Sequence, residues 1–238
     1  MTGVFGLPRY LREPALANAH AQSVELSSLR IEKQESEVRL SVLQAQVEPH
    51  FLFNTLASVK GTIREDPALA ESTIDALVDY LRSTIPMLRR DHERNESTLG
   101  LQVRLCERYL EVMRLRMGGR LSYRSELPSE LHHVPFPPLL LISLVENAIK
   151  HGIEPKPGAG SISIQAVNNG GKLIVSIVDD GVGFDGADHR FHSGVGLSNV
   201  RQQLKTLYGS DARVELSSNG IGATAKLVLP FHGAPLNT

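Results

Sequence analysis

A histidine set among large apolar residues is the first candidate for chemistry in this chain. His50 lies in the run Val-Glu-Pro-His-Phe-Leu-Phe-Asn at residues 47–54. An imidazole has an unperturbed pKa of about 6.5, so a neutral nucleophilic nitrogen is available near pH 7. Either Glu48 or Glu146 can orient the ring or accept its proton. His50 is therefore a candidate acceptor for a phosphoryl group.

Two later glycine-containing segments, the first with two carboxylates, could form a nucleotide pocket. Residues 179–183 are Asp-Asp-Gly-Val-Gly, and residues 194–197 are Gly-Val-Gly-Leu. A carboxylate at the end of a strand can accept a hydrogen bond from the exocyclic amine of adenine, and glycines allow the backbone to approach a flat ligand. A glycine pair before a helix suits phosphate. Alone, the first segment is better explained as an ordinary turn, because Asp-Gly is a common turn pair, and the second is a weak signal.

A third polar segment, Glu146-Asn147, belongs to a predicted helix. Asn147 and Lys150 are three residues apart, so they share a helix face. The amide oxygen of Asn147 suits Mg²⁺, a hard cation, and Lys150 can neutralise phosphate charge. The alternative is a solvated helix face that ends in Lys150 and His151.

Composition limits the class of protein. The chain has 238 residues, a net charge of −1 and one cysteine, Cys106. This charge favours neither nucleic acid nor an anionic membrane, and a lone cysteine fits a reducing compartment. No apolar run has the length of a membrane span or a secretory signal. We expect a cytoplasmic protein without direct nucleic-acid binding, either free or as the inner part of, or docked to, a membrane receptor.

The first part of the chain is predicted to be helical. Residues 1–40 form an N-terminal arm and a stalk whose weak heptad pattern fits a short dimeric coiled coil or a single amphipathic helix. Residues 41–92 form two helices, and Asp66 is the expected N-cap of the second, with Pro67 in its first turn. Pro86 is a candidate kink near the end of that second helix. Two wide apolar faces predict pairing with a second copy into a four-helix bundle.

After a polar linker the pattern changes to interleaved helices and strands over residues 97–232, followed by a tail at 233–238. Such interleaving predicts an α/β sandwich, and the whole chain is α+β. The expected helices are Leu99–Met117, Phe136–His151 and Val195–Tyr208, and the expected strands are 121–127, 161–167, 172–178 and 223–229.

The order of these motifs resembles the ATP-binding domain shared by sensor histidine kinases, DNA gyrase, Hsp90 and MutL, the GHKL or Bergerat fold. Residues 144–152 (LVENAIKHG), 179–183 (DDGVG) and 194–201 (GVGLSNVR) look like its three sequence boxes. The resemblance implies that Asn147 binds Mg²⁺, that Asp179 binds the adenine amine and that 184–193 form a lid. The other implied ATP-binding residues are Lys150, His151, Gly181, Gly183, Gly194, Gly196, Leu197 and Thr224.

The segment LQAQVEPHFLFNTLASV at 43–59 resembles the dimerisation and phosphoacceptor segment of LytS-type sensor histidine kinases, and this resemblance covers residues 40–232. It implies a homodimeric two-component kinase that phosphorylates His50 from Mg-ATP. Its catalytic groups would be His50, Glu146 and Lys150. It also implies a response regulator, with the LytTR type as one expected partner, that receives the phosphoryl group on an aspartate. Asn54, one helical turn after His50, is a candidate for dephosphorylating that partner.

Two departures from the wider family affect this interpretation. Ser143 stands where ATP-hydrolysing members carry a glutamate, which favours transfer to His50 over hydrolysis. Phe51 follows the histidine, where the commonest histidine kinases carry an acidic residue. Two alternatives stay open: a GHKL-type ATPase or protein serine kinase of an anti-sigma system, and a non-catalytic dimer scaffold that binds nucleotide.

Overall fold

The computed structural model describes residues 49–89, 97–184, 195–218 and 220–231. The chain divides into two compact units, Met1–Phe53 and Asn54–Thr238, and only 49–53 of the first unit are described. The predicted stalk, Glu48, Gly194 and lid residues 185–193 lie outside the described part. Within that part, no helix is both long enough and apolar enough to cross a membrane.

Two helices begin the described chain, α3 (Pro49–Thr62) and α4 (Pro67–Arg89). Pro49 is tolerated in the first turn because its missing N–H would have no partner within the helix there. Asp66 caps α4 as predicted: the Leu69 N–H donates to its Oδ1 at 3.0 Å. Pro86 lies inside α4, which continues to Arg89. Both His50 and Asn54 belong to α3.

Helix α4 packs against α5 (Leu99–Arg116). The rings of Tyr80 and Tyr109 lie 5.8 Å apart, centroid to centroid, and both side chains are buried. Arg108 and Asp79 add an exposed ion pair at 3.5 Å. The sequence predicted a domain boundary between these two helices, with domains at 41–92 and 97–232, and that division stays a prediction.

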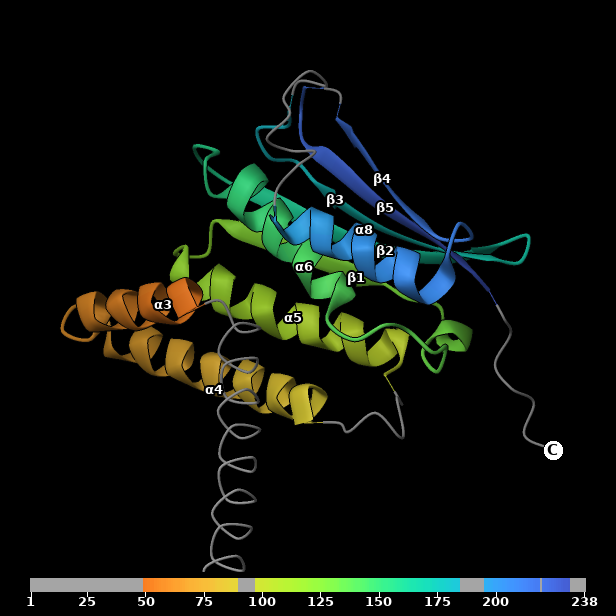
Figure 1. The fold of residues 1–238 in the computed structure, drawn as a ribbon. Helices are drawn as coiled ribbons and strands as arrows, with labels where there is room; N and C mark the ends of the chain where they lie inside the picture. Colours follow the sequence, from red (N-terminus) through yellow and green to blue (C-terminus); the bar gives the residue numbers. More distant parts are fainter. Residues whose placement is uncertain (1–48, 90–96, 185–194, 219, 232–238) are drawn as a thin grey trace, which may run out of the picture. The chain divides into compact units, whose positions relative to one another are not determined.

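Within the unit Asn54–Thr238, a five-stranded sheet forms one layer and helices form the other (Figure 1). Its order is β1-β2-β3-β5-β4, in which only β1 and β2 are parallel. A parallel pair needs a crossover, and the helical segment between β1 and β2 supplies it. The strands are β1 (Leu121–Glu126), β2 (Gly160–Asn169), β3 (Lys172–Asp179), β4 (Arg213–Ser218) and β5 (Ala223–Pro230).

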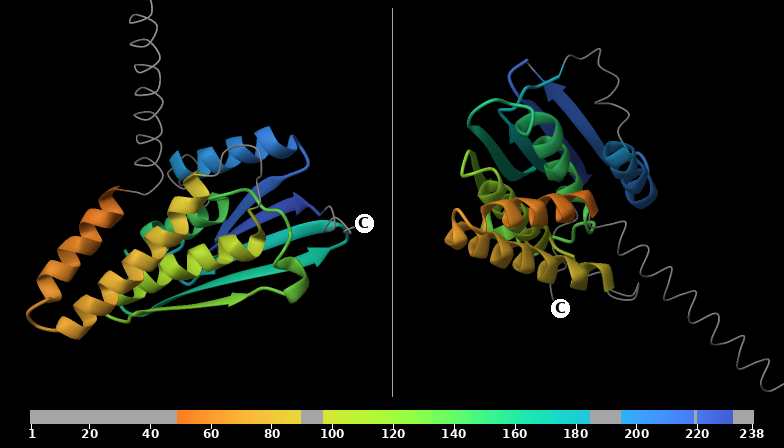
Figure 2. Two further views of the ribbon diagram at one scale, coloured as in Figure 1. Left: turned by 90° about the horizontal axis from the view of Figure 1, so that it is seen from below. Right: turned by 90° about the vertical axis from the view of Figure 1, so that its left-hand side faces the viewer.

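Helices α5, α6 (Leu140–Asn147) and α8 (Val195–Tyr208) lie over one face of the sheet (Figures 1 and 2). Side chains alternate along a strand, so every second residue of the central strands faces these helices. These core residues are at most 1% exposed: Ile162, Ile164, Leu173, Val175 and Ile177. The predicted α+β class, with helices followed by a mixed α/β domain, is confirmed.

Three local predictions need correction. The helix predicted from Phe136 begins at Leu140, because Pro137-Pro138 precede it and Leu139 adopts a left-handed φ of 59°. That helix then widens into a π-helix, η2 (Ala148–Ile153). Strand β4 was not predicted, because its RVELSS sequence carries only two apolar residues.

Candidate functional site

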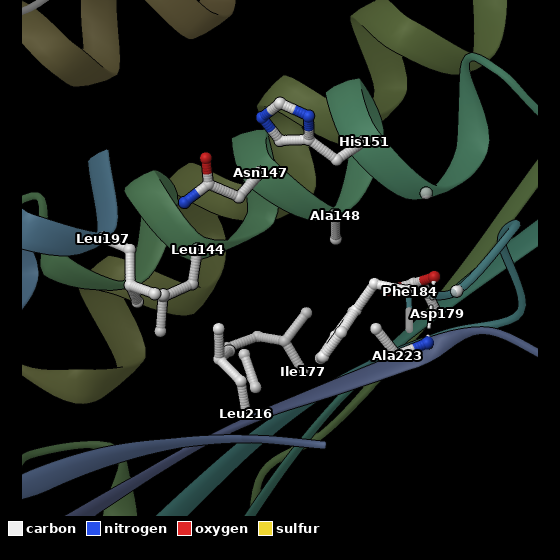
Figure 3. Close-up of a pocket in the computed structure, with 13 residues that line it drawn as sticks. Leu144, Asn147, Ala148, His151, Ile177, Asp179, Phe184, Leu197, Leu216 and Ala223 are labelled. Carbon is white, nitrogen blue, oxygen red and sulfur yellow. Dashed lines mark hydrogen bonds between the residues drawn. The ribbon is translucent and has the colours of Figure 1, made fainter. Parts of the chain in front are cut away.

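A pocket lies between the α6–η2 helix and strands β3, β4 and β5 (Figure 3). Its walls are mostly apolar, with a few polar groups, which is the usual composition of a small-molecule site. The lining residues are Leu144, Asn147, Ala148, His151, Gly152, Ile177, Asp179, Gly183, Phe184, Leu197, Leu216, Ala223 and Ala225.

The wide turn of η2 determines which helix residues reach the pocket. The Glu154 N–H donates to the Ile149 carbonyl at 2.8 Å, a bond that spans five residues rather than four. A wider turn brings residues four apart more nearly into line along the helix. Accordingly, both Asn147 and His151 line the pocket (Figure 3), whereas Lys150 is exposed and does not.

Asp179 ends β3 and supplies the buried acceptor of the pocket. Its Oδ1 accepts the N–H of Gly181 at 2.9 Å and that of Ala223 at 3.3 Å. The residue is only 5% exposed. Burial raises the pKa of its carboxyl group, although the two N–H donors act in the opposite direction. A carboxylate held this way is a strong acceptor for a ligand amine.

Glycines allow the chain to pass close to this carboxylate. A Cβ atom at Gly152 would lie 2.5 Å from Asp179 Oδ1, and one at Gly181 would overlap with the Gly152 backbone. The Val182 N–H also donates to the Gly152 carbonyl at 3.1 Å. The predicted glycine Gly181 therefore shapes the site from behind the lining, where it lies against Gly152, a lining residue that the sequence had not singled out.

The adjacent carboxylate, Asp180, has a different role. Its Oδ1 accepts the Ser161 N–H at 2.7 Å and pairs with Lys156 Nζ at 3.0 Å. Burial raises the pKa of Asp180, but these two partners outweigh burial and the net effect is a lowered pKa. Of the two aspartates, Asp179 faces the pocket and Asp180 holds the loop before β2.

His151 lies at the exposed rim of the pocket. Partial burial, followed by the neighbouring charge of Lys150, lowers the pKa of its imidazole, although Glu154 acts in the opposite direction. The ring therefore favours its neutral form at pH 7. A neutral imidazole can donate and accept a hydrogen bond without placing a full charge beside a ligand.

The first turn of α8 adjoins Asn147. A Cβ atom at Gly196 would lie 3.2 Å from Asn147 Nδ2, and Leu197 is buried against the pocket. Gly183, the other predicted glycine, lines the pocket with a left-handed φ of 66°. The structure thus brings together most residues that the sequence grouped as a nucleotide site.

Two predicted residues face elsewhere. Thr224 alternates with Ala223 and Ala225 on β5, so it projects from the opposite face of the sheet. Glu146 is half-buried and lies outside the pocket lining. Burial of Cys106 and Tyr109 on α5 raises the pKa of both side chains, and the negative charge of Glu146 raises it further. The predicted roles of Thr224, Glu146 and Lys150 stay predictions.

Several lining residues were missed at the sequence level. Phe184 directly follows Gly183, and Leu144 precedes Asn147 by one turn, so both positions carried a spacing signal. Leu216 carried none, because β4 itself was not predicted.

The chemistry of the pocket suits a flat heteroaromatic ring with an exocyclic amine. Leu144, Ile177 and Leu197 supply apolar surface, and Asp179 supplies the acceptor. Within the described residues, no cluster of three or more histidines, cysteines or carboxylates could hold a metal ion. The amide oxygen of Asn147 is an oxygen donor of the kind that Mg²⁺ prefers, and a magnesium ion here would take its other ligands from phosphate oxygens and water.

Comparison with known families agrees with this geometry. Residues 38–121 match the family model described as histidine kinase. Residues 132–233 match the model described as histidine kinase-, DNA gyrase B-, and HSP90-like ATPase. The second match contains every residue that lines the pocket, and the first contains His50.

Similar proteins include sensor protein LytS of Staphylococcus haemolyticus, 29% identical over 228 residues, which cover 91% of this chain and 38% of that protein. Sensor histidine kinase YpdA of Escherichia coli is 30% identical over 214 residues, or 86% of this chain and 37% of the relative. The chain therefore spans less than two fifths of either relative. The histidine kinase domain of a blue-light activated kinase from Erythrobacter litoralis aligns with a TM-score of 0.48 at 15% identity, covering 84% of this chain and 94% of that one.

Proposed function

We propose that this chain, which belongs to the histidine kinase family, binds ATP in the pocket beside Asp179. It then transfers the γ-phosphoryl group of that ATP to His50. The observation that carries this proposal is the buried Asp179 carboxylate, facing an apolar pocket opposite Asn147. An acceptor there selects a base with an exocyclic amine, and the apolar walls bind its ring.

Each pocket residue has a proposed task. Asp179 accepts a hydrogen bond from the adenine amine, while Leu144 and Ile177 contact the ring. Asn147 would hold Mg²⁺, which would neutralise phosphate charge. Lys150 and His151, at the helix end beyond Asn147, are proposed to approach the phosphates from the rim. Such groups act mainly by positioning and charge stabilisation, as phosphoryl transfer requires.

The transfer itself breaks the bond between the γ-phosphorus and the β,γ-bridging oxygen, and ADP leaves with that electron pair. A new phosphorus–nitrogen bond forms on the neutral imidazole of His50, and the proton on the other ring nitrogen passes to a base. Glu48 and Glu146 are both candidates for that base. The phosphoramidate then donates its phosphoryl group to an aspartate of a response regulator.

The proposal extends to partners. The homologous family implies a dimer and a response regulator. We propose that two copies pair through the helices within residues 41–92, that the regulator is of the LytTR type and that the chain works in the cytoplasm. We also propose that Asn54, exposed on α3, positions a water for dephosphorylating the regulator. Asn54→Ala should then slow loss of the regulator's phosphoryl group and leave phosphorylation of His50 intact.

Incubating the whole chain with γ-labelled ATP tests the proposal. We expect label that is acid-labile and base-stable, lost in His50→Gln and retained in His133→Gln, which changes an exposed histidine outside the pocket. Label on serine would indicate a protein serine kinase instead. Phosphate release without label would indicate an ATPase, and binding without either would indicate a scaffold.

A further inference from the structure

The hydroxyl group of Ser218, at the end of β4, uses its full hydrogen-bonding capacity. It donates to the Gly222 carbonyl at 2.7 Å and accepts the N–H of Phe184 at 3.0 Å and that of Gly220 at 3.3 Å. A serine hydroxyl offers one donor and two acceptor lone pairs, so all three are engaged. Ser218 itself does not line the pocket.

These three bonds join two segments on either side of Asp179. One is the turn between β4 and β5, and Ala223, the first residue of β5 after this turn, donates to Asp179 Oδ1 at 3.3 Å. A Cβ atom at Gly222 would overlap with the Asp179 carbonyl oxygen. The other segment is Gly183-Phe184, which leaves β3 and lines the pocket. A Cβ atom at Gly183 would lie 2.8 Å from Ser218 Oγ, so the two segments are in close contact.

Phe184 is the residue whose position this arrangement determines. Its ring lies in the pocket near Ile177 and Ala223 (Figure 3). Its backbone N–H is bound by a side chain of a strand that lies more than thirty residues away in sequence. The bond therefore ties the segment that leaves β3 to the end of β4.

We propose that Ser218 is a positioning residue for nucleotide binding: through its hydroxyl it holds Phe184 against the pocket before the nucleotide arrives. This inference rests on the proposed ATP site. Holding a ligand-contacting side chain in its bound position lowers the ordering cost of binding, so the benefit falls on affinity. The proposed chemical step uses groups on α3, α6 and η2, whereas the hydrogen bonds of Ser218 go to Phe184, Gly220 and Gly222, so the rate at saturating ATP should not change.

The test measures ATP affinity directly on the whole chain, by calorimetry or a fluorescent ATP analogue, and the steady-state KM and kcat of His50 labelling. Ser218→Ala removes all three bonds, and the one that positions Phe184 sets the effect on binding. We expect Kd and KM to rise together by about three- to tenfold, the size of one net hydrogen bond. The value of kcat should be unchanged. Ser218→Thr retains the hydroxyl and should restore both constants.

Ser217→Ala is the matched control. Ser217 is the same residue type on the same strand, but it is exposed and projects from the other face. Its replacement should leave Kd and KM unchanged. Should Ser218→Ala fail to fold, Ser218→Cys takes its place, with a rise in the same direction that is smaller than for alanine, because a thiol still donates and accepts weak hydrogen bonds.

The outcomes separate this inference from the proposed function. If the unaltered chain binds no ATP, the proposed function fails and this inference fails with it. If the unaltered chain binds ATP and Ser218→Ala binds it equally well, the inference alone is overturned. A fall in kcat at constant KM would also overturn it, because Ser218 would then act on the chemical step.

Discussion

Gly152 and Asp179 are in such close contact that a methyl group on the glycine would lie 2.5 Å from the carboxylate oxygen. The helix that carries Asn147 and His151 therefore meets the strand end that carries Asp179 without any intervening side chain. This contact sets the width of the pocket at the place where the adenine amine is proposed to bind.

Substitution of that glycine should close the pocket. Gly152→Ala would displace the Asp179 carboxylate, and overpacking of this kind costs about 1–3 kcal/mol in the free energy of unfolding. We expect a lower melting temperature and a loss of ATP affinity in calorimetry. Gly61→Ala is the control, because no atom lies within 4 Å of a Cβ built there. Unchanged ATP affinity in Gly152→Ala would contradict the role given to this contact.

Asp179→Asn should separate stability from binding. The carboxylate accepts the ligand amine, and losing a hydrogen bond to a charged group costs about 1.5–3 kcal/mol, so ATP affinity should fall about ten- to hundredfold. Burial raises the pKa of Asp179, so the folded chain binds the proton more tightly than the unfolded chain does. The ionised group therefore destabilises the fold above that pKa, and this penalty disappears as pH falls through it.

Without nucleotide, then, Asp179→Asn should melt at a higher temperature than the unaltered chain at pH 7, by a margin that shrinks in acid. Asp180→Asn makes the same charge change one residue later, but the pKa of Asp180 is lowered. Its ionised form contributes stability above the unfolded pKa, which is lost as pH falls through the folded pKa. Asp180→Asn should therefore lower the melting temperature. Equal shifts in the two variants would contradict these assignments.

His151 should make stability depend on pH in mildly acidic solution. Its pKa is lowered in the folded chain, mainly by burial, so below about pH 6.5 the unfolded chain takes up a proton more readily. Stability should fall as pH drops from there towards the folded pKa. His151→Gln should flatten this part of a chemical-denaturation series, whereas His133→Gln, at an exposed position outside the pocket, should retain the slope.

Gln102 should be required for the start of α6. Its side chain is fully buried, accepts the Leu139 N–H at 2.9 Å and donates to Ser97 Oγ at 2.9 Å. Gln102→Met keeps the volume but removes the partner of a part-buried N–H, which costs about 1–3 kcal/mol. Gln202→Met, on the exposed side of α8, should change the free energy of unfolding by less than about 0.5 kcal/mol. Urea denaturation measures both, and equal values would count against the Gln102 assignment.

Much of this arrangement was predictable from local pattern. The Asp66 cap, the α5 helix that ends before Gly118-Gly119, and the central β3 strand all follow from short-range spacing, and the structure contains them. The same is true of the pairing of Asn147 with Asp179, because a sequence resemblance covered both motifs.

The remaining features depend on contacts that no local pattern encodes. The left-handed Leu139 is held by Gln102, which lies 37 residues earlier in the chain. Asp180, and not Asp179, is turned from the pocket because its carboxylate binds two partners, Ser161 and Lys156, that are distant in the sequence. The exposed position of Lys150 follows from the π-helix, whereas an ordinary helix would have put it on the face of Asn147.

The π-helix also has a consequence for how this segment can change over evolutionary time. A π-turn holds one residue more than an α-helical turn, so the segment Ala148–Ile153 can lose one residue only by closing to an ordinary helix. An ordinary helix would turn Lys150 towards the face of Asn147 and change which side chains reach the pocket. We therefore expect insertions and deletions to fall in the loops on either side of this segment and not within it.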